Sequence, residues 1–189
     1  VYAAYAAKQM GLPIDHLIIG SNRNDILTRF FETGTMNAGN VEPSLSPSMD
    51  IQISSNFERY LCDLMDRNTD EMQALMNEFK DKGEFSLSAD KMAQARDTFS
   101  AYRCDDDATQ AMMKKFYADT GYMLDPHTAV GLSAGLQHRS GAKGDASAPL
   151  VALACAHPAK FPDAVEKAIG IRPELPPHLA DLYDRQEFV

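Results

Sequence analysis

The first part of the chain alternates between helix-like and strand-like patterns, and this order constrains the fold more than any other feature. Residues 1–10 are rich in alanine and predict a helix that ends at Gly11. The apolar run Leu17–Ile19 has the length of a buried strand, and residues 24–31 predict a second helix. A helix, a strand and a helix in this order are typical of a parallel sheet with crossover helices.

The middle of the chain predicts mostly helices. Apolar side chains recur at helical spacing over residues 55–80, 88–102 and 107–119, and methionine supplies many of them. We interpret these methionines as core residues, since this flexible side chain fills irregular gaps. Ser55 and Glu58 have the spacing of a capping box and predict where the first of these helices begins.

The strand-like pattern returns near the carboxyl end. Residues 126–139 predict a helix lined with small side chains, and the apolar run Leu150–Ala154 predicts a strand. We therefore expect an α/β part over residues 1–50 and a helical segment over residues 51–121. Residues 122–189 are expected to return to the α/β part and to close with short helices.

Composition narrows the classes of function. The formal net charge of -9 argues against a nucleic-acid partner, because neutralising phosphates needs a basic face. Cys62, Cys104 and Cys155 are odd in number and far apart, which predicts reduced thiols and a cytoplasmic protein. No apolar run approaches the length of a membrane span, so no membrane partner is expected.

Residues 125–131 predict a polar site at a helix start. Asp125 is a good N-cap, and Pro126 suits the first helical position, where a missing N–H costs nothing. Thr128 then falls in the first turn, beside free backbone N–H groups and the positive end of the helix dipole. Its hydroxyl could meet a ligand heteroatom or serve the helix itself, and the motif taken alone favours a plain capped helix start.

Five short motifs are more specific together, in their chain order, than any of them is alone: Asn22–Leu27, Ser46–Ile51, Ser54–Arg59, Asp125–Gly131 and Ala156–Phe161. Together they resemble the carboxyl-terminal part of threonine synthases, which are pyridoxal-phosphate enzymes of the tryptophan synthase β-like fold type. The resemblance runs from Val1 to near the end of the chain. It implies an α/β protein that forms part of a three-layer parallel-sheet fold with a helix-rich middle.

The resemblance also implies a reaction and a cofactor. Enzymes of this family convert O-phospho-L-homoserine and water to L-threonine and phosphate, with pyridoxal 5'-phosphate as cofactor. The threonine that matches Thr128 hydrogen-bonds the pyridine nitrogen of that cofactor. A neutral hydroxyl at this position does not hold a proton on the ring, which suits elimination and replacement rather than transamination.

Four further residues are candidates for the substrate or the cleft. Asn22 and Arg23 follow the first predicted strand, and arginine suits a substrate that carries a phosphate and a carboxylate. Ser46 lies in a polar loop, and His157 follows the second predicted strand, where open α/β sheets bind ligands. A structural role stays open for each: an ion pair for Arg23, a cap for Ser46 and a hydrogen-bonded loop residue for His157.

The family pattern indicates that part of the site lies outside this chain. In the family, the Schiff-base lysine and a Gly-Asn-Phe-Gly-Asp loop that cradles the cofactor phosphate lie far upstream. Residues 1–8 resemble the helix directly after that loop, so we expect a carboxyl-terminal fragment whose partner is the missing amino-terminal half. Lys160 is not expected to replace the lysine, because it falls in a segment flanked by prolines. We therefore expect the isolated chain to be inactive.

Two other interpretations stay open from the sequence. The first is another pyridoxal-phosphate lyase of the same fold type, such as a serine or threonine dehydratase, although Ser46–Ile51 and Ser54–Arg59 argue against it. The second is a non-catalytic helical interaction module that uses Ser55–Asp119 as its surface. A contiguous exposed apolar patch on those helices would favour the module.

Overall fold

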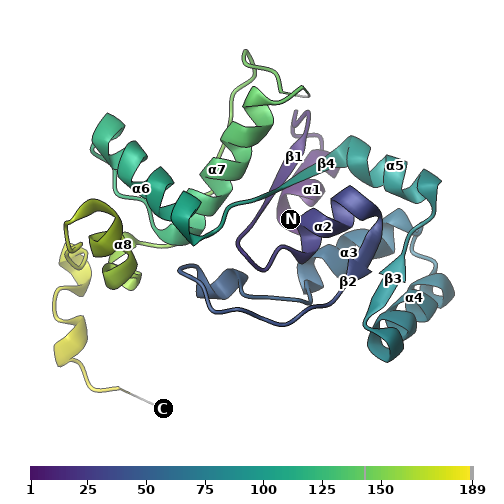
Figure 1. Ribbon diagram of the computed structural model, residues 1–189, viewed down its shortest axis with the longest axis horizontal. Coiled ribbons are helices and arrows are strands. Elements are labelled where there is room, and N and C mark those ends of the chain that lie inside the picture. Colours follow the sequence, from purple (N-terminus) through teal and green to yellow (C-terminus); the bar gives the residue numbers. More distant parts are fainter. Residues whose placement is uncertain (143, 188–189) are drawn as a thin grey trace.

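A parallel pair of strands lies at the centre of the computed structural model, which describes residues 1–142 and 144–187. Strand β1 (Leu17–Ser21) pairs with β4 (Phe99–Arg103), with Leu17 opposite Phe99 and Ser21 opposite Arg103. Burial alternates along β1, so successive side chains face opposite sides of the pair. Because the strands are parallel, their carboxyl ends meet at one edge (Figure 1).

Helices cover both faces of this pair and make three layers. Helix α7 (Pro126–Ser140) packs against β1 and β4 on the face to which Gly20 belongs. On the other face Leu17 and Ile19 join the main hydrophobic cluster, with α1 (Tyr2–Gln9), α2 (Ile26–Thr33), α3 (Ser55–Leu64) and α5 (Ala89–Thr98) around it. The expected α/β layering is therefore confirmed within the described residues (Figure 1).

The predicted helix over residues 88–102 is wrong in its second half. Helix α5 ends at Thr98, and the chain continues directly as strand β4. Phe99 is 1% exposed and lies within the main hydrophobic cluster, opposite Leu17 of β1. Pairing with a buried neighbouring strand outweighs the local helical spacing, since strand preference depends on packing more than on propensity. The boundaries of the expected helical segment 51–121 stay a prediction, but its end contributes a strand to the central sheet.

A second, smaller sheet escapes prediction from the sequence. Strand β2 (Thr35–Asn37) pairs antiparallel with β3 (Glu84–Ser86), and Thr35 lies opposite Ser86. Helix α4 (Thr69–Lys82) leads into β3. Strands of three residues are too short to give a periodic signal.

The predicted capping box of α3 is shifted by one residue. The N-cap is Ser54, whose hydroxyl accepts a hydrogen bond from the Phe57 N–H. Ser55 is the first helical residue. Serine is a favoured N-cap residue at either position. The backbone conformation determines which of the two serines is the N-cap.

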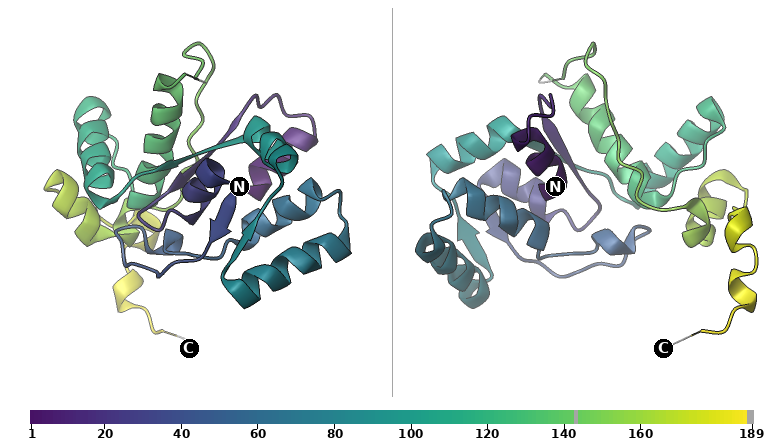
Figure 2. Two further views of the ribbon diagram at one scale, coloured as in Figure 1. Left: turned by 45° about the vertical axis from the view of Figure 1, so that its right-hand side comes forward. Right: turned by 180° about the vertical axis from the view of Figure 1, so that it is seen from behind.

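Helices α6 (Asp106–Thr120) and α8 (Pro162–Ile169) pack with α7 around a second hydrophobic cluster. Figure 2 shows these helices to one side of the strands. The sequence predicts a last short helix over His178–Asp184, and the structure has two short 3-10 turns there instead, Pro177–Leu179 and Leu182–Asp184. In the two described ranges, no helix combines the length and apolarity needed to cross a membrane.

The predicted strand Leu150–Ala154 is wrong for this chain. The segment is extended but pairs with no strand among the described residues, and residues 151–154 are all exposed. It runs back along α7, as the right-hand view of Figure 2 shows. A strand needs a neighbour for its backbone hydrogen bonds, and the described chain offers none at this place.

Candidate functional site

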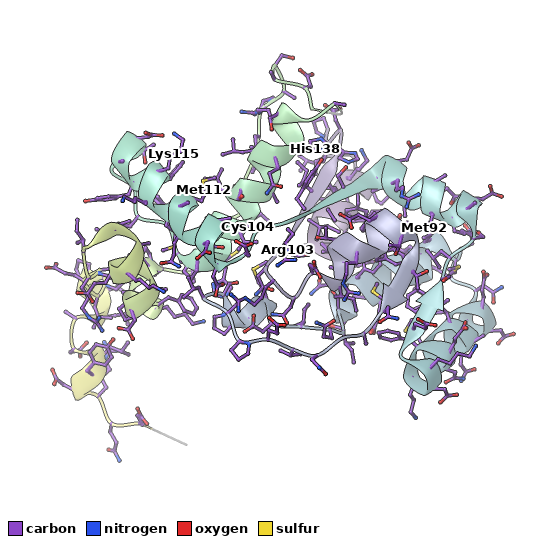
Figure 3. The ribbon with its side chains drawn as sticks, viewed as in Figure 1. Met92, Arg103, Cys104, Met112, Lys115 and His138 are labelled. Carbon is purple, nitrogen blue, oxygen red and sulfur yellow. The ribbon has the colours of Figure 1, made fainter. Side chains whose placement is uncertain are left out.

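The candidate site lies at the carboxyl edge of the parallel strands. Asn22 follows β1, Cys104 follows β4, and the loop over residues 38–54 passes across this edge. Figure 3 shows Arg103 and Cys104 where β4 leads towards α6. Open α/β sheets bind ligands at this edge, because loops and helix starts gather there.

Asn22 connects the strand edge to the loop. Its side chain is 1% exposed, and its amide nitrogen lies 2.8 Å from Ser44 Oγ, 3.0 Å from Ser46 Oγ and 2.7 Å from Asp50 Oδ1. The Asn22 oxygen accepts from the Asn24 N–H at 2.8 Å, which fixes the orientation of the amide. An NH2 group has two protons, so these oxygens compete for them.

Asp50 gathers the donors of this network. Its carboxylate accepts from the Ser44 hydroxyl at 2.6 Å, the Ser44 N–H at 3.0 Å and the Asn24 side chain at 3.0 Å, besides Asn22. All of these donors are neutral groups. The loop is therefore held in place by hydrogen bonds around one carboxylate, and Ser46, 1% exposed, is buried within it.

Arg23 is held by ion pairs at the same edge. Its guanidinium lies 3.1 Å from Asp106 Oδ2 and 3.9 Å from Glu42 Oε2. Asp106 stands in the first turn of α6, and its other oxygen accepts from the Leu45 N–H at 3.2 Å. The structural alternative for Arg23, an ion pair, is thus realised in this structure.

Asp125 caps α7 as predicted, and its carboxylate also contacts the side chains of His127 and Thr128. One of its oxygens accepts from the His127 N–H at 2.9 Å and from the Thr128 N–H at 3.4 Å. His127 in turn accepts a hydrogen bond at Nε2 from the Ser48 N–H at 3.3 Å, so its proton sits on Nδ1, 3.1 Å from Asp125. The imidazole therefore bridges the loop and the helix start.

Thr128 is buried, and both functions of its hydroxyl are in use. The hydroxyl donates to Asp125 Oδ2 and accepts from the Cys155 N–H at 2.9 Å. The Ala156 N–H also donates to Asp125 Oδ2, at 3.3 Å. The start of α7 and residues 155–156 are thus joined through one carboxylate and one hydroxyl.

His157 and Lys160 follow directly after residues 155–156. His157 is exposed and caps the 3-10 turn Pro158–Lys160, where its Nδ1 accepts from the Ala159 N–H at 3.2 Å. Lys160 is exposed and lies over the Phe161 ring, with Nζ 5.6 Å from the ring centroid. Burial and the nearby Asp125 carboxylate raise the pKa of the Cys155 thiol, so this thiol stays protonated at neutral pH.

The structure brings Asn22, Arg23, Ser46 and Thr128 into one connected network, whereas, among the described residues, the His157 side chain bonds only within its own 3-10 turn. Asn22 and Ser46 touch directly, and the loop reaches Thr128 through Ser48, His127 and Asp125. Asp106 was missed because the strand before it was predicted as helix. Asp50 lies within the motif Ser46–Ile51, but nothing in the sequence placed it against the end of β1. Among the described residues, no group of three or more His, Cys, Asp or Glu side chains could hold a metal ion.

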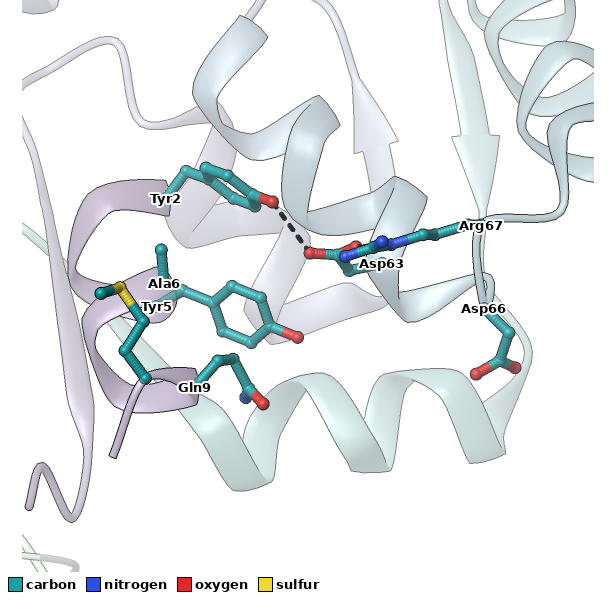
Figure 4. Close-up of a pocket in the computed structure, with 8 residues that line it drawn as sticks. Tyr2, Tyr5, Ala6, Gln9, Asp63, Asp66 and Arg67 are labelled. Carbon is teal, nitrogen blue, oxygen red and sulfur yellow. Dashed lines mark hydrogen bonds and ion pairs between the residues drawn. The ribbon is translucent and has the colours of Figure 1, made fainter. Parts of the chain in front are cut away.

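An open pocket of about 500 Å³ lies away from this network. It is lined by Tyr2, Tyr5, Asp63 and Arg67, among others, and the Tyr2 hydroxyl donates to Asp63 at 3.0 Å (Figure 4). The Tyr5 ring contacts Phe99 at the amino end of β4, with centroids 6.3 Å apart. The pocket therefore lies at the opposite end of the strands from the candidate site.

Comparisons with known proteins agree on one family. The model of the threonine synthase C-terminal region matches residues 128–189. Threonine synthase from Pseudomonas aeruginosa is 45% identical over 188 residues, which cover 99% of this chain and 39% of the relative. Threonine synthase from Saccharomyces cerevisiae is 40% identical over 184 residues, which cover 90% of this chain and 36% of the relative.

Solved structures give the same result. Threonine synthase from Brucella melitensis, solved with PLP bound, has a TM-score of 0.92 and 46% identity over 98% of this chain and 39% of that chain. The yeast enzyme has a TM-score of 0.89 and 35% identity over 98% of this chain and 40% of that chain. The fold and the polar edge of the sheet define the class: an α/β protein of the tryptophan synthase β-like type. Within that class, this chain is similar in sequence and in fold to the carboxyl-terminal part of threonine synthases. It spans 39% of the length of the Pseudomonas relative.

Proposed function

We propose that this chain serves as the carboxyl-terminal part of a threonine synthase that converts O-phospho-L-homoserine and water to L-threonine and phosphate. The observation that carries the proposal is the match in sequence and in fold over nearly the whole chain. The protein would act in the cytoplasm, in agreement with free Cys62, Cys104 and Cys155.

Pyridoxal phosphate is the proposed cofactor, and its electron-withdrawing ring supplies the carbanion stabilisation when it is bound. Thr128 is the proposed contact of the ring nitrogen. In this structure the Thr128 hydroxyl donates its hydrogen bond to Asp125. To contact the ring nitrogen, the hydroxyl would have to exchange this hydrogen bond for one to the cofactor. Asp125 would still accept from His127 and from the Ala156 N–H, so the exchange leaves no bare buried carboxylate. The donor set therefore fits the group.

Asn22, Ser46 and Arg23 are the proposed substrate edge. The Asn22 amide and the Ser46 hydroxyl are neutral groups held in place by the loop network, which suits them to orient a polar substrate. Arg23 would bind an anionic group of the substrate with its guanidinium, which also pairs with Asp106 and Glu42. His157 follows Ala156, whose N–H bonds to Asp125, and is proposed only as a wall of the cleft.

The Schiff-base lysine and the cradle of the cofactor phosphate are proposed to come from the amino-terminal part of the same protein. Lys160 is a poor substitute, because it is exposed and its ammonium stays in water. Lysines that form Schiff bases are activated in desolvated surroundings.

A complementation assay tests the function. This chain is refolded together with the amino-terminal part of the Pseudomonas relative, and threonine and phosphate are measured with pyridoxal phosphate and O-phospho-L-homoserine. We expect both products, in equal amounts, from the mixture and neither from the chain alone. Phosphate release by the isolated chain, or an assembled mixture that forms no threonine, would count against the proposal.

A further inference from the structure

We propose that His127 is a positioning residue of the substrate edge. Its neutral imidazole fastens residues 46–50, called here the loop turn, to the start of α7, and protonation of the imidazole releases the loop turn. Asn22 and Ser46 form a substrate edge only if the proposed function holds, so the role in the reaction rests on that function. The fastening itself depends on contacts within this chain.

The loop turn carries two of the groups that orient Asn22. Ser46 and Asp50 stand at its ends, and a single 3-10 turn lies between them. The Met49 N–H donates to the Ser46 carbonyl at 2.8 Å, which makes the loop turn compact. The Asn22 amide nitrogen lies 3.0 Å from Ser46 Oγ and 2.7 Å from Asp50 Oδ1. A shift of the loop turn therefore displaces the partners of the Asn22 amide.

His127 holds the middle of the loop turn. The Ser48 N–H donates to His127 Nε2 at 3.3 Å, and Asp125 Oδ1 lies 3.1 Å from His127 Nδ1. The side chains of His127 and Asp125 are 5% and 1% exposed, so both are fixed within the start of α7. An ionised carboxylate can only accept, and the bond at one ring nitrogen decides where the proton sits. Asp125 thus keeps the proton on Nδ1 and leaves Nε2 as an acceptor.

The surroundings of the ring allow a second proton, but the bond to Ser48 does not. Asp125 is the charged group bonded to the ring, and its negative charge favours a positive imidazole. The Phe161 ring stacks on the other side of this contact with centroids 4.6 Å apart, and the Lys160 ammonium lies 5.6 Å from the Phe161 centroid. The second proton would sit on Nε2, where it faces the Ser48 N–H. Two donors cannot bond each other, so the contact would be lost.

The ends of the loop turn have anchors of a different kind. Asn22 holds Ser46 and Asp50, and the Asp106 carboxylate accepts from the Leu45 N–H at 3.2 Å. Histidine is the side chain whose charge ordinarily changes between about pH 5 and pH 8. Mild acid would therefore release the middle of the loop turn while its ends stay attached. We expect the loop turn to loosen without unfolding the chain.

Nuclear magnetic resonance tests the fastening on this chain alone. At pH 8, the nitrogen shifts of His127 should report a proton on Nδ1 and a bare Nε2. The Ser48 amide should be protected from exchange by roughly tenfold, as expected for one hydrogen bond, and should lose this protection towards pH 5. A proton on Nε2 at pH 8, or equal protection at both pH values, would overturn the proposal.

Two variants separate the acceptor from the titration. His127→Asn keeps a donor near the position of Nδ1 but offers no acceptor to Ser48, whereas the amide oxygen of His127→Gln reaches the position of Nε2 and does not titrate. We expect Ser48 to be unprotected at pH 8 in the first variant and protected at both pH values in the second. His178 is exposed and lies in a distant 3-10 turn, so His178→Asn should behave as the parent chain. Parental protection of Ser48 in His127→Asn would count against the proposal.

Kinetics test the role in positioning. Each chain is refolded with the amino-terminal part of the Pseudomonas relative, and KM and kcat for O-phospho-L-homoserine are measured at pH 8 and pH 6. We expect His127→Asn to raise KM by about three- to tenfold at pH 8 and to change kcat by less than about twofold, because ground-state placement is what is lost. The ratio of the parent KM to that of His127→Gln should rise towards pH 6; this ratio cancels the titration of the substrate phosphate.

The outcomes distinguish this inference from the proposed function. Threonine formation with equal KM in His127→Asn and the parent supports the function and removes the positioning role. A Ser48 amide that behaves as expected in a mixture that forms no threonine supports the fastening and counts against the function. A loss of kcat with unchanged KM in His127→Asn would give His127 another role and overturn the proposal.

Discussion

Asp125 joins two segments that lie far apart in the sequence. Its buried carboxylate accepts from the first turn of α7 and from the Ala156 N–H, and Thr128 adds a second link to Cys155. The sequence predicted the cap because capping is local. The other donors, the N–H groups of Cys155 and Ala156, lie 27 residues after Thr128 and 31 after Asp125, and no local pattern indicates them.

Thr128→Val tests the link between these segments. The substitution keeps the shape of the side chain but leaves the Cys155 N–H without its acceptor and removes a donor from Asp125. We expect the free energy of unfolding to fall by about 1–3 kcal/mol, the usual cost of unpaired buried polar groups. Urea unfolding at pH 7 measures it. Thr128→Ser keeps the hydroxyl and should recover most of the loss; an equal loss in both variants would contradict the link.

Tyr60 makes the free energy of unfolding depend on pH in the alkaline range. Burial raises the pKa of Tyr60 to about 12, against about 10 in an unfolded chain. The folded protein therefore holds the phenol proton more tightly. This contribution to stability is fully present below about pH 10 and is lost as the pH rises towards 12.

The corresponding measurement compares two tyrosine variants. We expect Tyr60→Phe to make the free energy of unfolding fall less steeply over this alkaline range, as followed by urea unfolding at stepped pH. Tyr183 is 79% exposed, so Tyr183→Phe should keep the slope of the parent chain. If the slope is the same in all three proteins, Tyr60 is not the responsible group.

At the scale of elements, the contact of α7 with β1 depends on small residues. A Cβ added at Gly20 would stand 3.1 Å from the Val130 carbonyl oxygen and 3.3 Å from the Ala134 Cβ. A Cβ added at Gly131 would meet nothing within 4 Å. The contact therefore requires a small residue at Gly20 but leaves room for a side chain at Gly131.

Alanine substitution of each glycine tests this contact. We expect Gly20→Ala to lower the free energy of unfolding by about 1–3 kcal/mol, because strand and helix must move apart. Gly131→Ala should raise it by about 0.5–1 kcal/mol, the usual gain within a helix. Thermal and urea unfolding give both values. Equal effects of the two substitutions would show that the contact is looser than described.

The elements divide into those that local pattern predicts and those that depend on a neighbour. Helices α2 and α7 and strand β1 were predicted, with ends that differ by up to about two residues, because caps, glycines and apolar spacing are local signals. Strand β4 was taken for helix, because its strand character comes from pairing with β1. The prediction for Leu150–Ala154 is wrong in the opposite sense: its residues favour a strand, but no described strand lies beside it.

The same distinction applies to the site. Asn22, Ser46 and Thr128 were named as candidates because each stands in a motif, and their role at a site stays a prediction. Their contacts could not be predicted, because Asp50 reaches Asn22 through the loop and Asp106 reaches Arg23 after the missed strand β4. Residue types are readable from sequence, while the geometry of a network depends on tertiary packing.

At the scale of the whole molecule, the described residues form two hydrophobic clusters of unequal size. The main cluster joins both strands of the central pair to α2, α3 and α5, whereas the second comprises five buried residues between α6, α7 and α8. Stability within a protein is uneven, and the part with fewer buried contacts opens first. We expect α6 and α8 to open without unfolding the sheet.

Val165→Ala and Leu61→Ala compare the two clusters. Both side chains are 0% exposed, Val165 in the second cluster and Leu61 in the main one. We expect Val165→Ala to speed amide exchange in α8 by a factor that corresponds to about 2 kcal/mol, while β1 exchanges as before. Leu61→Ala removes buried surface from the cluster that holds the sheet, so it should speed exchange in β1, while α8, which opens without the sheet, exchanges nearly as before. Val165→Ala that speeds exchange in β1 as much as in α8 would instead mean that the two clusters unfold as one unit.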